Sequence, residues 1–468
     1  MTARSLRLTG ATALAMAALA MPSPARAQAA TPEVTLRGVP SPQRSDTPIA
    51  LTLAEAIRRG LEQNLGTILQ EQRVRGAESA RLRALSDLVP HVSAAARDSA
   101  QVVNLAAYGF TAFEGIPSLI GPFTVFDARL YATAPILDLS AVNHLHANTA
   151  RLAASQADAR QMRETVILAV GNVYLEVGAD AARVASARSQ VATAETLVRL
   201  ADDQRAAGLV AGIDVVRQQV ELQAARARLI AAQNALDKRK LSLARSIGLA
   251  PGQAFDVVES PAFIAAPPVS MDAALADATA HRDDLAAARA RVEAARSDAK
   301  AAHAEHLPSV HLDADYGALG TRPSDAEKTY AVAASVRMPI FEGGAGKARS
   351  LDADAELRAR EAELSDLAAG VRYEIEAAML DVTAAAGQVE VTRSARDLAT
   401  SQLDQAQDRF RAGVASTLEL AQAQDALARA SESYITSVYL HAIAKATLAR
   451  AMGVVEERFV ELIGGSKS

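Results

Sequence analysis

Two pairs of histidines in this sequence have a spacing that could serve a metal ion. His303 and His306 are three residues apart, which can bring both imidazoles to one face of a helix. They lie just before Pro308, and no third ligand is evident near them. His144 and His146 are two apart and would point to different faces of a helix. Because the chain contains no cysteine, thiolate zinc sites and thiol catalysis are excluded, and we expect no metal site.

A glycine-rich stretch ending in lysine, residues 343–347, could cradle a phosphate. Its first glycine lies too close to Lys347 for a nucleotide-binding phosphate loop, and Ala348 stands where Ser or Thr is required. The chain also lacks a G-x-S-x-G nucleophile elbow and a glycine-rich cofactor loop in a strand-helix-strand setting. We therefore predict no catalytic residue and no cofactor, and the chain is predicted not to be an enzyme.

Charged residues flank two glycine turns, at Gly208 and Gly413. Asp214 follows the first turn, and Glu419 follows the second at the same distance. Three arginines lie close to these turns: Arg205, Arg409 and Arg411. An arginine beside a carboxylate forms an ion pair, although an exposed pair contributes little stability. We predict that pairs between these arginines and the two acids hold the turns in place.

The N-terminal residues are typical of a secretion signal. Arg4 and Arg7 precede an apolar stretch over 8–21, and residues 25–27 offer a small-x-small cleavage site. We expect 1–27 to be a signal peptide, followed by an N-terminal extension over 28–50. Beyond the signal we find no run of about 18 uncharged apolar residues, so membrane contact would require β-strands. The formal net charge of −5, without a basic block, argues against a nucleic-acid partner.

The two halves of the chain resemble each other. Residues 51–57 align with 269–275, and the turn at Gly208 with its Asp214 aligns with Gly413 and Glu419. A duplicated chain imposes one architecture on both halves. Several prolines between the halves stop helices and suit a connector. The predicted units are a first repeat over 51–250, a connector over 251–268, a second repeat over 269–455 and a C-terminal tail over 456–468.

Within each half the hydrophobic period changes from helical to alternating and back. The predicted strands are 91–103 and 123–134 in the first half, and 309–317 and 329–338 in the second. Prolines mark the junctions: Pro90 and Pro308 are predicted to close a helix, Pro135 and Pro339 to close a strand.

Strands of about ten residues with one apolar face have the length of a membrane β-strand. A soluble hairpin on a core is the alternative, and the first strand carries Asp98 on its apolar face.

Each half continues into two long helices, predicted over 139–206 and 213–247, and over 344–411 and 418–452. At 1.5 Å per residue the first would reach about 100 Å. Small apolar residues from Val166 to Ala201 recur about every 3.5 residues, which is a coiled-coil period. Four strands cannot close a barrel, which needs about eight, so the chain must oligomerise if its strands lie in a membrane.

This order of elements resembles the TolC and OprM family of outer-membrane efflux proteins. Residues 51–56 with Asn64 look like the family's opening helix, 339–344 like its strand-to-helix turn, and 207–215 like its helix-turn-helix tip. The resemblance covers about 51–453 and implies a mainly α fold with a membrane β-barrel. It implies a homotrimer with one 12-stranded barrel in outer-membrane lipid, above a long α-helical barrel in the periplasm. The absence of a cysteine after the signal agrees with TolC and departs from OprM, so lipid anchoring is not expected.

The resemblance also implies a function and a site. The chain would be the outer-membrane channel of a tripartite efflux or type I secretion system, a passive duct docked onto a periplasmic adaptor and, through it, an inner-membrane pump. The hairpin tips would form the closed entrance and meet the adaptor: Gly208, Leu209, Val210, Gly212, Gly413, Val414 and Ser416. Glu419 stands where the family places an acid of the entrance constriction, and Asp214 is its counterpart. Gln422 stands where TolC has a second acid, which departs from a double acidic ring.

Two alternatives remain open. Three copies of Glu419 near a threefold axis would repel one another by roughly 1 kcal/mol per pair or less and would attract cations. Instead, Glu419 could be a solvated residue favoured near a helix N-terminus by the helix dipole.

For the whole chain, the alternative is a periplasmic coiled-coil adaptor or structural protein, which would not need two lipid-length hairpins. The sequence does not predict whether the cargo is a drug, a metal, a metabolite or a protein.

Overall fold

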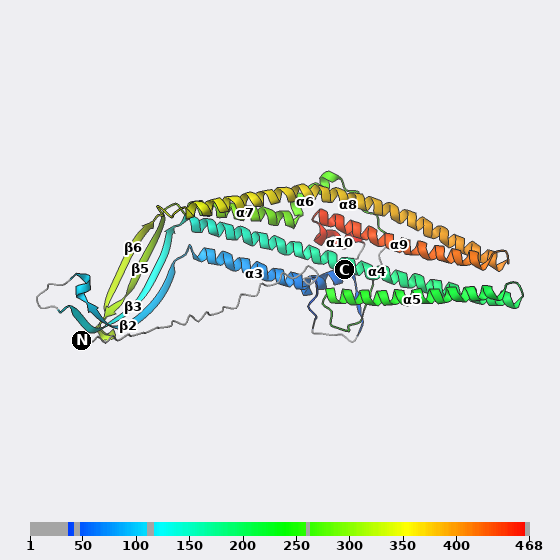
Figure 1. Ribbon diagram of the computed structural model, residues 1–468, viewed down its shortest axis with the longest axis horizontal. Helices are drawn as coiled ribbons and strands as arrows, with labels where there is room; N and C mark the ends of the chain where they lie inside the picture. Colours follow the sequence, from blue (N-terminus) through cyan, green and yellow to red (C-terminus); the bar gives the residue numbers. More distant parts are fainter. Residues whose placement is uncertain (1–35, 42–46, 110–116, 259–262, 464–468) are drawn as a thin grey trace, which may run out of the picture.

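The computed structural model describes residues 36–41, 47–109, 117–258 and 263–463 of an elongated molecule (Figure 1). A four-stranded sheet lies at one end, and long helical hairpins extend to the other end. Short elements surround the middle of the helices. The predicted signal peptide over 1–27 lies outside the described residues.

The first half of the chain contains two short helices, a β-hairpin and a long helical hairpin. Its elements are β1 (Ile49–Leu51), α2 (Leu53–Gln63), α3 (Leu65–Ser86), β2 (His91–Asn104), η1 (Leu105–Tyr108), β3 (Leu119–Leu137), α4 (Leu139–Ala206) and α5 (Gly212–Ser246). Side-chain caps explain where two of the helices start. The Glu55 amide donates to Thr52 Oγ1 (3.2 Å) before α2, and the Ala141 amide donates to Asp138 Oδ1 (2.9 Å) before α4.

The second half repeats this order. Its elements are β4 (Phe255–Val257), α6 (Met271–His281), α7 (Asp283–Ala304), β5 (Ser309–Gly320), η2 (Pro323–Asp325), β6 (Glu327–Arg337), α8 (Ala345–Arg411), α9 (Thr417–Ala451) and α10 (Val455–Ile463). Corresponding helices have almost the same length: α4 and α8 have 68 and 67 residues, and α5 and α9 have 35 each. The stretch predicted as connector contains β4, which pairs in parallel with β1, and the predicted tail contains most of α10.

The four strands form one antiparallel sheet in the order β2-β3-β5-β6. The prediction that Pro135 closes a strand is wrong, because β3 continues to Leu137. Its register against β5 shifts between Pro135 and Leu137, and such an irregularity accommodates a residue without a backbone N–H. Helices α3 and α7 end before Pro90 and Pro308, so these prolines precede the strands and do not close the helices themselves. Pro339 follows the end of β6.

The sheet has one apolar and one polar face. Leu130 lies opposite Ala94 and Tyr316, and these side chains share the apolar face with Val332. Asp98 lies opposite Phe126 and therefore also belongs to this face. On the polar face, Arg129 forms ion pairs with Asp127 (2.6 Å) and Asp315 (2.7 Å), and Thr133 donates to Asp313 (3.0 Å). Strands β2 and β6 are the two edges of the sheet.

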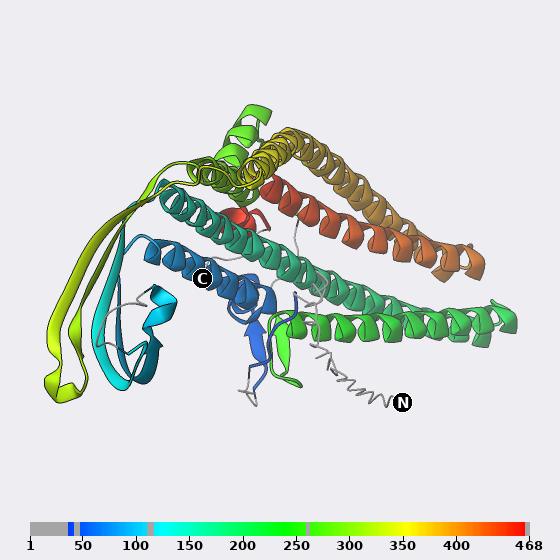
Figure 2. The ribbon, with the colours of Figure 1, turned by 60° about the vertical axis from the view of Figure 1, so that its left-hand side comes forward.

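Helix α4 is the central element of the helical part. Figure 2 shows α4 running between α5 and the α8–α9 pair, and α3 and α7 pack along the half of α4 that is nearer the sheet. A stretch of α4 is long and apolar enough by composition to cross a membrane, yet 56% of it is buried inside the structure. At Gly171 an added Cβ would lie 2.1 Å from Phe459 Cζ, so this glycine makes room for α10. Packing against neighbouring helices therefore accounts for the apolar character of α4.

Candidate functional site

The two helical hairpins end in glycine turns at the same end of the molecule (Figure 1). Gly208 and Gly413 have φ angles of +75° and +72°, a left-handed conformation that favours glycine. An added Cβ would meet nothing within 4 Å at either position, so conformation, and not space, requires the glycine. After the turns the chain re-enters a helix: the Glu419 amide donates to Ser416 Oγ (3.2 Å), and the Ala211 amide donates to Asp214 Oδ2 (3.3 Å).

Both turns present apolar side chains to solvent. Leu209 and Val414 are each 68% exposed, and Ile213 and Leu418 beside them are more than half exposed. The residues proposed from sequence as docking tips lie on these two turns, except Gly212, which is the first residue of α5. They are Gly208, Leu209 and Val210 on the first turn, and Gly413, Val414 and Ser416 on the second.

Below the turns the two hairpins pack into one unit. Eight buried side chains from four helices form its core: Leu197, Ala201, Val215, Leu403, Ala406, Phe410, Leu420 and Ala423. The amide of Gln204 on α4 donates to the Phe410 carbonyl at the end of α8 (2.8 Å). The tips of α4–α5 and α8–α9 are therefore held together both by apolar packing and by a directed hydrogen bond.

Asp214 connects the two tips. Its Oδ1 accepts a hydrogen bond of 2.6 Å from Thr417 Oγ1, and Arg217 lies 3.3 Å from the same oxygen. Thr417 is 2% exposed, so this bond is shielded from water. The sequence analysis did not identify Thr417 or Gln204, because a threonine at the start of a helix and a glutamine in a coiled coil have ordinary local explanations.

Glu419 has different partners although it stands at the equivalent position. Its Oε1 lies 3.3 Å from Nε of Arg409, and its side chain is 43% exposed. Gln422 is exposed nearly one turn further along α9. The other two arginines do not reach the acids: Arg411 pairs with Asp408 at 3.0 Å, and the Arg205 guanidinium lies beside Gly212.

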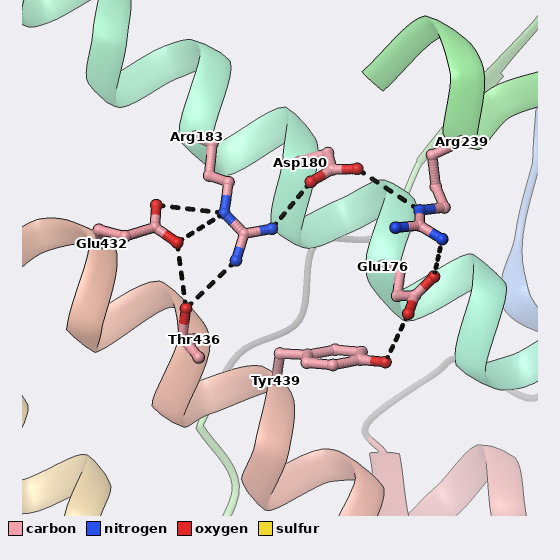
Figure 3. A network of polar contacts seen from close by, with 7 residues as sticks. All are labelled: Glu176, Asp180, Arg183, Arg239, Glu432, Thr436 and Tyr439. Atoms are coloured by element: carbon pink, nitrogen blue, oxygen red, sulfur yellow. Dashed lines mark hydrogen bonds and ion pairs between the residues drawn. The ribbon is translucent and has the colours of Figure 1, made fainter. Parts of the chain in front are cut away.

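A second charged cluster, the mid-helix network, lies halfway along α4 (Figure 3). Arg239 of α5 pairs with Glu176 (2.6 Å) and Asp180 (3.6 Å) of α4. Asp180 also accepts from Arg183 on the same helix (2.8 Å), and Arg183 reaches across to Glu432 of α9 (2.9 Å).

The mid-helix network closes through two further residues of α9. Arg183 donates to Thr436 Oγ1 (3.2 Å), and Tyr439 donates its hydroxyl hydrogen to Glu176 (3.0 Å). Burial and the negative charge of Glu176 raise the pKa of Tyr439 to about 12, so its hydroxyl keeps this proton. The first hairpin and α9 are thus joined at a second level, far from the tips.

The histidine and glycine groups noted in the sequence have other partners. His303 lies 3.3 Å from Asp354, and His144 lies 3.9 Å from Asp298, which raises the pKa of His144. His306 packs over Gly346. Within the described residues no group of three or more potential ligand side chains comes together. Gly343 and Gly344, both with positive φ, turn the chain from β6 into α8.

Comparison with known proteins shows which family and which relatives this chain resembles. Residues 68–249 and 274–454 match the family described as outer membrane efflux protein, one stretch in each half. The chain is 26% identical over 309 residues to the pyoverdine export outer membrane protein OpmQ of Pseudomonas aeruginosa, covering 64% of either chain. It is 24% identical over 348 residues to the alkaline protease secretion protein AprF of the same species, covering 71% of this chain and 70% of AprF. The matched stretch thus spans somewhat less than two thirds of OpmQ.

The fold also matches a solved structure. The outer membrane protein VceC from Vibrio cholerae superposes with a TM-score of 0.74 at 20% identity, over 86% of this chain and 96% of VceC. The resemblance inferred from the sequence and the expected outer-membrane location are both confirmed by these matches. The family comprises passive efflux channels and not enzymes, in agreement with the prediction that this chain is not an enzyme. Because the family model matches well over half of its residues, the chain belongs to the outer membrane efflux protein family.

Proposed function

We propose that this protein is the exit duct of a tripartite efflux or type I secretion system and works as a homotrimer. The observation that carries the proposal is a four-stranded sheet with an apolar face, a polar face and, among the described residues, two edge strands, β2 and β6. In lipid an open edge leaves backbone groups unpaired. Three copies of four strands would give twelve, with β6 of each copy paired to β2 of the next, which is enough to close a barrel.

The helices support the same assembly. Helix α8 exposes Tyr373 (73%), Leu380 (66%) and Leu398 (69%), and helix α5 exposes Val220 (60%) and Ile230 (67%). In a ring of three copies, α8 of one copy would lie against α5 of the next. Burial of these side chains would stabilise the ring by about 25 cal/mol per Å² of apolar surface removed from water.

The tips are proposed as a gate. Within one copy, Thr417–Asp214 and Gln204–Phe410 join the two hairpins, and Arg409–Glu419 links the two helices of the second hairpin. Opening the entrance would separate these contacts. Glu419 is the more exposed of the two acids, so three copies of it would form one ring that attracts cations, and Gln422 would add no charge.

The partners follow from the exposed tips. Leu209 and Val414 offer apolar contacts around the glycine turns, which suit docking onto a periplasmic adaptor that connects to an inner-membrane pump. The relatives differ in cargo: the name of OpmQ refers to pyoverdine, and that of AprF refers to a protease. We therefore propose that the duct does not select the cargo and that selection lies with the pump.

The proposed function is tested by membrane fractionation, followed by light scattering of the detergent-extracted protein with the detergent mass subtracted. The expected result is a trimer in the outer-membrane fraction that produces channels in planar bilayers. A soluble periplasmic monomer would contradict the duct and would favour the coiled-coil adaptor.

A further inference from the structure

Lys445 of α9 is a buried cation. Its side chain is only 3% exposed, and Nζ donates to the backbone carbonyls of Ile264 (2.9 Å) and Leu462. Within the described part of the chain, no carboxylate lies within ion-pair distance of Nζ. An ammonium group has three donors, so two carbonyls leave one N–H without a partner among the residues that the structure describes.

This arrangement is costly for the folded chain. Buried lysines are normally paired, because the penalty for removing an ion from water is several kcal/mol. Burial lowers the pKa of Lys445 to about 8, so the group still carries most of its charge at pH 7. His441, one turn earlier, is also buried beside Phe263 and has an Nε2 without a partner, and its lowered pKa keeps it neutral. An imidazole carries no negative charge in either protonation state, so His441 does not compensate the charge of Lys445.

Lys445 also lines a cavity of about 290 Å³. Apolar side chains from three segments form its wall, among them Pro267 and Val269 before α6, Leu448 of α9 with Met452 directly after that helix, and Leu462 of α10. Arg458 and Glu461 are its other charged residues, and Arg458 lies 3.9 Å from Asp277. Small-molecule sites commonly start at about 300 Å³ and combine apolar walls with a few polar groups.

We propose that this cavity binds a small aliphatic monocarboxylate, with the carboxylate on Lys445 and the chain along the apolar wall. The negative charge would supply the missing counter-ion, and one carboxylate oxygen would accept the remaining N–H of Lys445. The short chain would bury apolar surface at about 0.8 kcal/mol for each CH₂. Because the wall belongs to α9, α10 and the segment before α6, an occupant would fasten these three segments together. The site lies away from the tips and does not depend on the proposed duct function.

The test is isothermal titration of octanoate into the full-length protein held in an amphipathic polymer, at pH 7, with the empty polymer subtracted. We expect one octanoate to bind per chain. Octanol and octylamine should bind with at least tenfold lower affinity. Lys445→Met should lower the affinity for octanoate at least tenfold. Lys238→Met, which removes an exposed lysine of α5, should leave it unchanged. Raising the pH to 9.5 should also weaken binding at least tenfold, because Lys445 loses its charge while octanoate keeps its own.

Equal octanoate affinity in Lys445→Met, equal affinity for octanol, or no binding at millimolar octanoate would each overturn the proposal. If Lys445→Met does not reach the native mass, Val269→Phe replaces it, because this change fills the cavity and retains the ammonium group. Octanoate binding that persists in a Val269→Phe protein of native mass would then refute the site.

Discussion

Asp214 and Glu419 show how two equivalent residues can acquire different tasks. Both are in the first turn of a helix after a glycine turn, and both were recognised in the sequence with Arg409. Asp214 is turned toward Thr417 of the other hairpin, whereas Glu419 remains exposed beside Arg409. Local spacing predicts the acids because helix N-termini favour them. It could not predict Thr417 as a partner, because that contact joins residues 203 positions apart in the chain.

Replacing Thr417 with valine should loosen the closed tips. The change preserves shape but removes the donor to Asp214, and a buried hydrogen bond to a charged group is worth about 2 kcal/mol. We expect a higher resting conductance in planar bilayers. Thr400→Val is the matched control, since the Thr400 hydroxyl donates to the Arg396 carbonyl within α8. Identical resting conductance in Thr417→Val and the wild type would show that the Asp214–Thr417 hydrogen bond does not help to close the gate.

Replacing Glu419 with glutamine should reduce cation selectivity. An acid ring that contributes roughly 1 kcal/mol or less would change the permeability ratio by up to about fivefold. The measurement is the reversal potential in a salt gradient, and Glu390→Gln, an exposed change on α8, is the control. An unchanged reversal potential would leave Glu419 as an ordinary residue at a helix start.

The helices depend on close approaches as well as on their hydrophobic period. Sequence patterns located α4 with its correct ends, because Asp138 caps it and Gly208 terminates the hairpin arm. They did not explain Gly171, which lies in mid-helix where glycine costs about 1 kcal/mol. The structure explains this glycine, because the Phe459 ring of α10 packs against it. The sequence analysis had described that part of the chain only as a C-terminal tail, so this contact could not be foreseen.

Gly171→Ala should therefore destabilise the protein despite the higher helix propensity of alanine. Its Cβ would lie 2.1 Å from the Phe459 ring, and overpacking of this kind costs about 1–3 kcal/mol. Gly76→Ala on α3, where nothing lies within 4 Å, should be neutral or stabilising. Thermal unfolding measures both, and Phe459→Leu should partly rescue Gly171→Ala. Equal melting temperatures for the two alanine variants would contradict this account.

At the scale of the whole molecule, the order of elements was predictable and the contacts between halves were not. Proline positions and changes of hydrophobic period located both hairpins and both pairs of long helices. The mid-helix network could not be inferred, because Arg183 and Glu432 are 249 residues apart. Pro135 was misplaced because the sequence does not reveal a register shift that lets a strand continue past a proline.

The middle of the molecule should also make stability depend on pH. Glu164 of α4 faces Asp283, Asp284 and Glu456 as well as Arg450, and burial first, then these acids, raise its pKa to about 7. The folded chain therefore holds this proton more tightly than the unfolded chain, whose carboxyl has a pKa near 4.3. The resulting stability is complete below the unfolded pKa and is lost as the pH rises through 7.

Glu164→Gln should abolish this loss. Relative to the variant, the wild type should lose about 1–2 kcal/mol between pH 5 and pH 8, a value reduced for partial exposure of the carboxyl. Chemical unfolding at the two pH values measures the difference. Parallel pH profiles for the two proteins would show that Glu164 titrates normally.

The matched helix lengths have a further consequence. Helices α2 and α6 have 11 residues each, α3 and α7 have 22 each, and the long helices agree to within one residue. The strands carry no such constraint, with 14 and 19 residues in one hairpin and 12 and 11 in the other. An insertion in one helical hairpin would move its tip past the tip of the other hairpin. The hydrogen bond between Thr417 and Asp214 would then be broken. During evolution the arms of this protein can therefore lengthen only in pairs, whereas its β-hairpins are free to drift apart in length.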